Sequence, residues 1–262
     1  MMEAFTPKKQ EKVESLTTVQ YWDSRYKEEE HVEWLLDSEK LGKRVEEVAA
    51  SRWGKEARIL HLGCGTSLLP QHLHKLGYTR VVNVDNSPVC ISSMNQRFPH
   101  LTFRLMDLND LQCGEQTFDM VVEKSTLDTL ISDCSQGREE GKLLVERGLK
   151  EVNKVLGPDG VFLSVSLLSP SEHSEILSPL GGKVKLERLK GGEDQVDCTV
   201  ATVFLGDFNN VGGDQPVGGS VIQESFNDQH ITMVDDLSDE EESYTEDGVS
   251  DEYKDLVKSM IS

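Results

Sequence analysis

The chain has 262 residues, and its 27 Lys and Arg residues against 47 Asp and Glu residues give a formal net charge of −20. So acidic a protein is a poor candidate for binding nucleic-acid phosphates over a broad surface, and it favours a basic protein partner. No stretch approaches the roughly 18 consecutive apolar residues of a membrane span, and the N-terminus lacks the apolar core of a secretory signal.

The five cysteines are scattered along the chain and form no CxxC pair. This spacing argues against both a zinc cluster and a disulfide framework. His72 and His74 have no acidic or cysteine neighbours at metal-ligand spacing, so we predict no metal site. A reducing compartment is the default for such cysteine usage, and we expect a cytoplasmic protein.

From residue 57 onward, short apolar runs alternate with segments of helical pattern. The predicted strands lie at 57–62, 80–85, 101–106, 118–122 and 161–167, and the predicted helices at 68–76, from Ser87-Pro88 onward, and at 141–156. Ser87 is a suitable N-cap and Pro88 suits the first helical turn. Two β-rich segments, 183–189 and 196–205, follow as a predicted antiparallel hairpin. The alternation predicts an α/β fold with a doubly wound, mostly parallel sheet.

Charge and composition divide the chain into three parts. Residues 1–56 form a predicted N-terminal helical segment, and residues 57–206 form the core domain. Residues 207–262 contain 15 acidic residues and two lysines, a net of −13, and begin with a glycine-rich stretch. We predict that this last part is a mostly disordered acidic tail.

Polar residues and glycines gather where the predicted strands end. Gly63 and Gly65 follow the first strand, Asp85 ends the second, Asp107 follows the third and Glu123 follows the fourth. Parallel sheets bind ligands at this edge, glycines allow close approach of a ligand, and a carboxylate at the second strand end accepts ribose hydroxyls. The sequence therefore predicts a site for an adenosine-containing ligand.

Several motifs, taken in order, resemble the class I S-adenosylmethionine (SAM) methyltransferases, which have a Rossmann-like seven-stranded sheet. The matching segments are 60–67 (LHLGCGTS), 83–87 (NVDNS), 106–107 (MD) and 118–128 (FDMVVEKSTLD). More narrowly, they resemble the lysine methyltransferase branch that modifies elongation factor 1A or citrate synthase. That branch typically has Asp and Gly where this chain has Glu123 and Ser125.

The resemblance extends upstream to Tyr21-Trp22-Asp23-Ser24-Arg25-Tyr26 and Glu33-Trp34. In the family this segment folds over the cofactor, and its Arg can pair with the methionine carboxylate. The resemblance implies SAM as cofactor, and Glu123 and Asp128 as catalytic acids that orient the acceptor ammonium or help its proton leave. The implied cofactor-binding residues are Trp22, Arg25, Gly63, Cys64, Gly65, Asp85, Asn86, Asp107, Leu108 and Glu123.

The predicted function is therefore SAM-dependent protein-lysine N-methylation, with elongation factor 1A as the expected substrate class. We expect a monomer that binds a basic face of its protein substrate, but no nucleic acid and no membrane. Citrate synthase, or a small molecule methylated on the same fold, is the alternative acceptor. Two other classes fit less well. An NAD-dependent oxidoreductase would share the glycine turn, but Leu68 replaces its third glycine, and an inactive acidic binding module would not need the intact strand-end residues.

Overall fold

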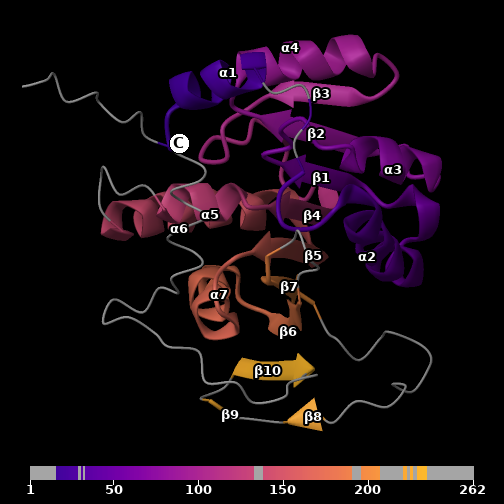
Figure 1. Cartoon of the computed structure of the whole chain (residues 1–262). Coiled ribbons are helices and arrows are strands. Elements are labelled where there is room, and N and C mark those ends of the chain that lie inside the picture. The colour runs from indigo at the N-terminus through magenta and orange to yellow at the C-terminus, as the bar shows by residue number, and fades with distance from the viewer. Residues whose placement is uncertain are drawn as a thin grey trace, which may run out of the picture.

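The computed structural model describes residues 16–28, 31, 33–132, 138–190 and 196–206, and the backbone of residues 221–222, 225–226 and 229–234. Strands and helices alternate through the core (Figure 1). The N-terminal and core elements are α1 (Val19–Glu28), α2 (Ser38–Arg52), β1 (Ile59–Leu62), α3 (Leu69–Lys75), β2 (Val81–Asp85), α4 (Pro88–Arg97), β3 (Thr102–Leu105), β4 (Phe118–Lys124), α5 (Thr126–Ile131), α6 (Arg138–Val155), β5 (Leu156–Ser166), α7 (Pro170–Leu177), β6 (Lys183–Leu189) and β7 (Cys198–Phe204).

These strands form one sheet in the order β3-β2-β1-β4-β5-β7-β6. All neighbours from β3 to β5 are parallel, whereas β7 is antiparallel to both β5 and β6. Strand order reverses between β1 and β4, which is where doubly wound sheets bind ligands. The predicted seven-stranded fold and its C-terminal hairpin are confirmed.

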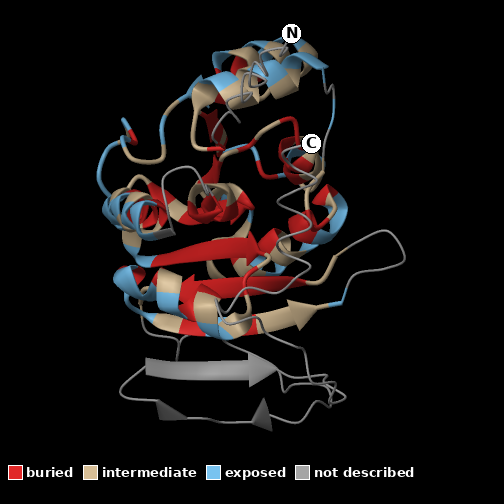
Figure 2. Cartoon of the chain, turned by 60° about the vertical axis from the view of Figure 1, so that its left-hand side comes forward, coloured by how far each residue is buried: buried red, intermediate tan, exposed pale blue. Residues whose placement is uncertain are grey.

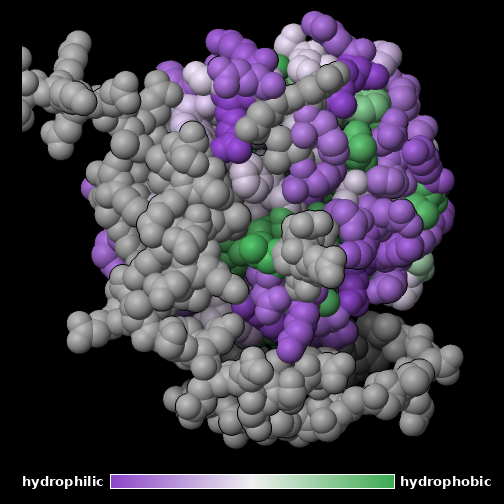
Figure 3. Space-filling model, viewed as in Figure 1, coloured by the Kyte–Doolittle hydropathy of each residue, from purple (hydrophilic) through white to green (hydrophobic). Residues whose placement is uncertain are grey.

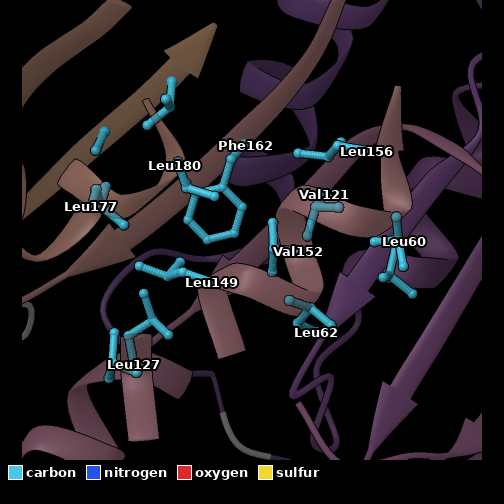
Figure 4. Close-up of a cluster of buried hydrophobic side chains, with 14 of the residues drawn as sticks. Leu60, Leu62, Val121, Leu127, Leu149, Val152, Leu156, Phe162, Leu177 and Leu180 are labelled. Carbon is cyan, nitrogen blue, oxygen red and sulfur yellow. The ribbon is translucent and has the colours of Figure 1, made fainter. Parts of the chain in front are cut away.

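Helices cover the sheet on both faces, and the strands between them are the most deeply buried part of the chain (Figure 2). On one face, α5, α6 and α7 bury apolar side chains against residues such as Leu60, Val121 and Phe162 (Figure 4). On the other face, α2 and α3 pack on residues such as Ile59 and Met120. Burial of each large apolar side chain stabilises the folded state by about 1.5–3 kcal/mol. Because the central strands are covered on both faces, their sequences are nearly continuous apolar runs.

Local signals set several element ends. The Ser87 side chain accepts a hydrogen bond from the Cys90 amide, so Ser87 caps α4 as predicted. β5 begins earlier than its predicted start at 161, because Leu156 pairs with Phe118 before the register shifts. The sequence analysis did not predict α5, which is a helix of only 6 residues that starts directly after β4.

The structure adds strands beyond residue 206. β8 (Val221–Ile222), β9 (Ser225–Phe226) and β10 (Gln229–Val234) lie within the segment predicted to be mostly disordered. β10 pairs in parallel with β6 and extends that edge of the sheet. The rest of the segment predicted to be mostly disordered, residues 207–220, 223–224, 227–228 and 235–262, lies outside the described residues.

On the face seen in Figure 3, most of the described side chains are hydrophilic, in keeping with the high charge content. None of the helices within the described ranges is both long and apolar enough to cross a bilayer.

Candidate cofactor site

The loop after β1 requires glycine at two positions. Gly63 and Gly65 have φ values of 56° and 47°, in the left-handed region that disfavours L-side chains. A Cβ atom on Gly63 would lie 2.1 Å from the Thr126 Oγ1 atom, and one on Gly65 would lie 3.0 Å from the Tyr26 hydroxyl. The glycines therefore admit α1 and the start of α5 to the loop as well as leaving room for a ligand.

Asp85 ends β2 beside this loop, and only 6% of its surface is exposed. One carboxylate oxygen accepts the Gly65 amide at 2.9 Å, and the other accepts the Ser87 amide at 2.9 Å. Burial raises the pKa of Asp85, while the hydrogen bonds from Ser87 and Gly65 oppose that shift. The carboxylate is thus fixed in orientation by its two backbone partners, and each oxygen keeps a further lone pair for a ligand.

A pocket opens at the carboxyl ends of β1, β2 and β4, where the parallel strands meet the loops that follow them. Its walls include most of the predicted cofactor residues: Trp22, Gly63, Cys64, Gly65, Asp85, Asn86, Asp107 and Leu108. The Asp107 carboxylate also accepts the Asn109 amide at 2.7 Å, which shapes the turn after β3. The structure therefore brings together side chains from three successive strand ends, as the sequence predicts.

The N-terminal segment supplies one wall of the pocket. Trp22 and Tyr26 of α1 stack with ring centroids 5.7 Å apart, and both line the pocket. Asp23 fixes α1 to α4, because its carboxylate accepts the Ser87 hydroxyl at 2.5 Å and the Val89 amide at 3.4 Å. Tyr26 and Trp34 were not among the predicted cofactor-binding residues. Both lie in the upstream motif that resembles the family, and that motif is the feature of the sequence that could have identified them.

Arg25 does not line the pocket. Its guanidinium lies over the Trp34 ring, 5.1 Å from the centroid, and donates to the Tyr21 hydroxyl at 3.0 Å. The sequence analysis expected it to pair with the cofactor carboxylate. In the structure it instead supports Trp34, which is a pocket residue.

Glu123 is fully buried and is not among the residues that line the pocket. Its carboxylate accepts the amides of Thr126 at 3.0 Å and Leu127 at 3.3 Å, and also the Ser164 hydroxyl. The Ser164 oxygen lies 2.7 Å from the Nε2 atom of buried His173. Burial, and secondly the charge of Asp128, raise the pKa of Glu123 to about 8, and burial lowers the pKa of His173 to about 3.

Asp128 is also buried away from the pocket, on α5. It accepts the Ser166 hydroxyl at 2.5 Å and the Leu167 amide at 3.3 Å, and burial raises its pKa to about 6. Both predicted catalytic acids therefore tie α5 to β5 and to the loop after it. Neither is among the residues that line the pocket.

Residues 124–126, which directly follow Glu123, do line the pocket. Ser125 has a φ of 62°, so a non-glycine residue occupies the left-handed region between β4 and α5. The family motif has glycine at this position, so the motif is the feature of the sequence that could have indicated a left-handed backbone here. The backbone turns here because α5 starts immediately after the strand.

Replacing Ser125 with glycine is expected to stabilise the protein. The left-handed conformation costs an L-residue about 1–2 kcal/mol, while glycine loses about 0.5–1 kcal/mol of backbone entropy, so Ser125→Gly should raise the free energy of unfolding by about 0.5–1 kcal/mol. Denaturant unfolding measures this change. Ser132→Gly is the matched control, since Ser132 ends the same helix with a φ of −78° and its substitution should lower stability. Equal losses in both variants would contradict the prediction.

Comparison with known proteins agrees with this geometry. Residues 60–164 match the family model described as a methyltransferase domain. The chain is 36% identical over 161 residues to mouse EEF1A lysine methyltransferase 4, an alignment that covers 58% of this chain and 62% of that protein. It is 33% identical over 175 residues to the mouse eEF1A lysine and N-terminal methyltransferase, covering 63% of this chain and 24% of that protein. The chain thus spans less than two thirds of the length of these relatives.

Among solved structures, the fold is similar to that of a protein described in work on conversion of a disulfide bond into a thioacetal group during echinomycin biosynthesis. The TM-score is 0.55 at 17% identity, covering 71% of this chain and 92% of that one. This likeness shows the fold. Residues 60–164 match a methyltransferase domain model, and the resemblance to the elongation factor 1A lysine methyltransferases predicted from the motifs is confirmed.

The residues present fit SAM, the cofactor that this domain implies. The Asp85 carboxylate suits ribose hydroxyls, and the positive-φ glycines beside it admit close approach of a ligand to the backbone. Three buried residues that could together hold a metal ion, Cys64, Asp85 and Cys90, have their ligand atoms within 4.8 Å of one another. Cys64 and Asp85 also line the cofactor pocket, so this group overlaps it.

Proposed function

We propose that this chain is a SAM-dependent protein-lysine N-methyltransferase that acts on eEF1A in the cytoplasm. The observation that carries the proposal is the combination of the Asp85 pocket with 36% identity to a relative named EEF1A lysine methyltransferase 4. Bound SAM supplies an already activated methyl group. The protein therefore has to hold the cofactor, align the acceptor amine and exclude competing water.

The acceptor lysine must react as the neutral amine, although its ordinary pKa is about 10.4. Transfer from water into a partly apolar pocket favours the neutral form. Aromatic and aliphatic side chains that include Trp22, Trp34 and Leu130 line the pocket and provide such surroundings. In this proposal desolvation, rather than a carboxylate base, promotes loss of the lysine proton.

We propose positioning roles for Glu123 and Asp128 in place of direct contact with the substrate. Glu123 accepts two amides at the start of α5, and Asp128 holds the same helix to the residues after β5. These contacts fix the turn through Ser125 and Thr126, which line the pocket. Their loss would therefore disturb the pocket indirectly.

A basic face on the protein substrate would complement the net charge of −20. Opposite charges accelerate encounter and make it sensitive to salt. The same charge disfavours nucleic acid as a partner. We propose that the protein acts as a monomer.

A methyl-transfer assay with labelled SAM and a hypomethylated cell extract tests the proposed function. We expect one labelled protein that is identified as eEF1A by mass spectrometry, with the label on a lysine and a rate that falls as salt is added. Label on citrate synthase, or only on small molecules, would replace eEF1A by the corresponding alternative acceptor. Absence of both transfer and SAM binding would refute the proposal.

A further inference from the structure

An ion pair between buried Lys124 and half-buried Glu33 joins the end of β4 to the segment between α1 and α2. Lys124, the last residue of β4, lines the cofactor pocket, yet only 3% of its side chain is exposed. Its ammonium group donates to the Glu33 carboxylate and, at 2.8 Å, to the Leu36 carbonyl oxygen. Both partners precede α2 and lie about 90 residues away along the chain, so the contact is wholly tertiary.

Glu33 connects the same point to the glycine loop. Its carboxylate accepts the Leu68 amide at 2.7 Å and the Ser67 hydroxyl at 3.1 Å. Ser67 and Leu68 are the residues between the loop and α3. Close by, the Nδ1 atom of His31 lies 3.1 Å from the Thr66 carbonyl oxygen. One carboxylate therefore bridges the ends of β4 and β1, which flank the topological switch point.

These contacts hold a short segment, residues 31 and 33–37, which we call the strap. Trp34 lies in the strap and lines the pocket, and the Arg25 guanidinium packs over its ring. The hydrogen bonds of Asp23 to α4 hold only α1. Trp34 also packs against the core beneath α2 and α3. Glu33 and Lys124 supply the polar contacts that fix the backbone on either side of it.

The electrostatics of the pair are consistent with a fixed contact. Burial by itself would raise the pKa of Glu33, but the charge and hydrogen bond of Lys124 hold that pKa below its ordinary value. Burial lowers the pKa of Lys124, and Glu33 opposes that shift. Desolvating two charges is costly unless both are well hydrogen-bonded, and here each charge has a further partner besides the other.

We propose that Glu33 and Lys124 form a latch that positions the strap as a wall of the cofactor pocket and thereby sets cofactor affinity. Both are positioning residues: they act through Trp34 and the glycine loop rather than on the reacting atoms. The inference rests on the proposed function only in taking SAM as the ligand. It joins one residue from each of two sequence motifs, neither of which was among the predicted cofactor-binding or catalytic residues.

A double-mutant cycle tests the latch. Glu33→Gln keeps an acceptor for Ser67 and Leu68 but removes the charge, and Lys124→Met keeps the length of the side chain. Because truncating one partner of a buried charge pair leaves the other uncompensated, we expect each variant to weaken SAM binding at least about tenfold, measured by calorimetry. The double variant should be no weaker than the single variants, since the two residues act through one contact. Lys150→Met, which breaks an exposed pair with Glu146 on α6, is the matched control and should bind like the wild type.

Two further readouts separate positioning from catalysis and from general loss of stability. The kcat of Glu33→Gln at saturating SAM should stay within about threefold of wild type, because binding and not the chemical step is affected. Amide exchange of Leu36 should accelerate in the variants without cofactor. Unchanged SAM affinity in folded Glu33→Gln and Lys124→Met would overturn the latch, as would a loss of kcat at unchanged affinity.

A milder variant covers the case in which neither single variant folds. Glu33→Asp keeps the charge but withdraws the carboxylate by one methylene, and it should still weaken SAM binding several-fold; wild-type affinity would overturn the proposal. The latch and the proposed function can fail separately. Weaker SAM binding by the variants, with no protein methylated by the wild type, would support the latch and refute lysine methylation. A wild type that binds no SAM would overturn both.

Discussion

Asp85→Asn is expected to lower the affinity for SAM by at least about 100-fold, because hydrogen bonds from two ribose hydroxyls to a carboxylate contribute about 1.5–3 kcal/mol each. The substitution replaces one acceptor oxygen with an NH2 group, so only one of the Gly65 and Ser87 amides keeps its acceptor. It also removes the negative charge that favours those donors. Titration calorimetry with SAM and with its demethylated product measures the loss.

Asp119→Asn is the matched control for this experiment. Asp119 is also an aspartate on a strand of the sheet, but its carboxylate pairs with Arg58 at 2.6 Å and does not line the pocket. Its substitution should reduce stability and leave SAM affinity unchanged. Thermal unfolding of both variants identifies any general loss of structure. Binding by Asp85→Asn as tight as that of the wild type would remove Asp85 from the cofactor site.

Glu123→Gln is expected to abolish a pH dependence of stability that the wild type shows between pH 6.5 and 8. The pKa of Glu123 is about 8 in the folded protein and 4.5 ordinarily, so the folded state binds one more proton than the unfolded state in this range. Stability therefore falls as pH rises, by about 1.4 kcal/mol per pH unit, or about 2 kcal/mol over the window. Glutamine cannot ionise, so the variant should show no such fall.

The other buried groups act mainly outside this window. The pKa values of His61 and His173 are lowered to about 4 and about 3 from 6.5, so the stability gained from them rises with pH, is complete only about one pH unit above 6.5, and offsets part of the fall in the lower half of the window. The pKa of Asp128 is about 6, so most of its destabilising effect also lies below the window. Denaturant unfolding at several pH values measures the trend. Glu146→Gln, an exposed substitution on α6, should keep the wild-type slope, and parallel curves for wild type and Glu123→Gln would contradict the prediction.

Glu123 and Lys124 show how much of the site could be predicted from the sequence. Successive residues of a strand point to opposite faces of the sheet. Val121 belongs to the core beneath α5 to α7, whereas Met120 and Val122 belong to the core beneath α2 and α3. Glu123 follows the first set, towards α5 and Ser164, and Lys124 follows the second, towards the strap. The motif indicated that these residues matter, but the side chain that faces the pocket is Lys124.

The sequence was sufficient to predict the alternation of strands and helices in a mostly parallel sheet, the glycine loop, the acid at the end of β2 and the resemblance to methyltransferases. These features are local: apolar runs specify buried strands, glycine permits positive φ, and parallel strands bring their ends to one edge. Only the tertiary structure decided where Arg25, Glu123 and Asp128 point, that Glu33 meets Lys124, and that β10 extends the sheet beside β6. Each of these depends on contacts between residues far apart in the chain or on packing of a particular face. No spacing within a single segment encodes such contacts, because their free energy arises only when the elements pack together.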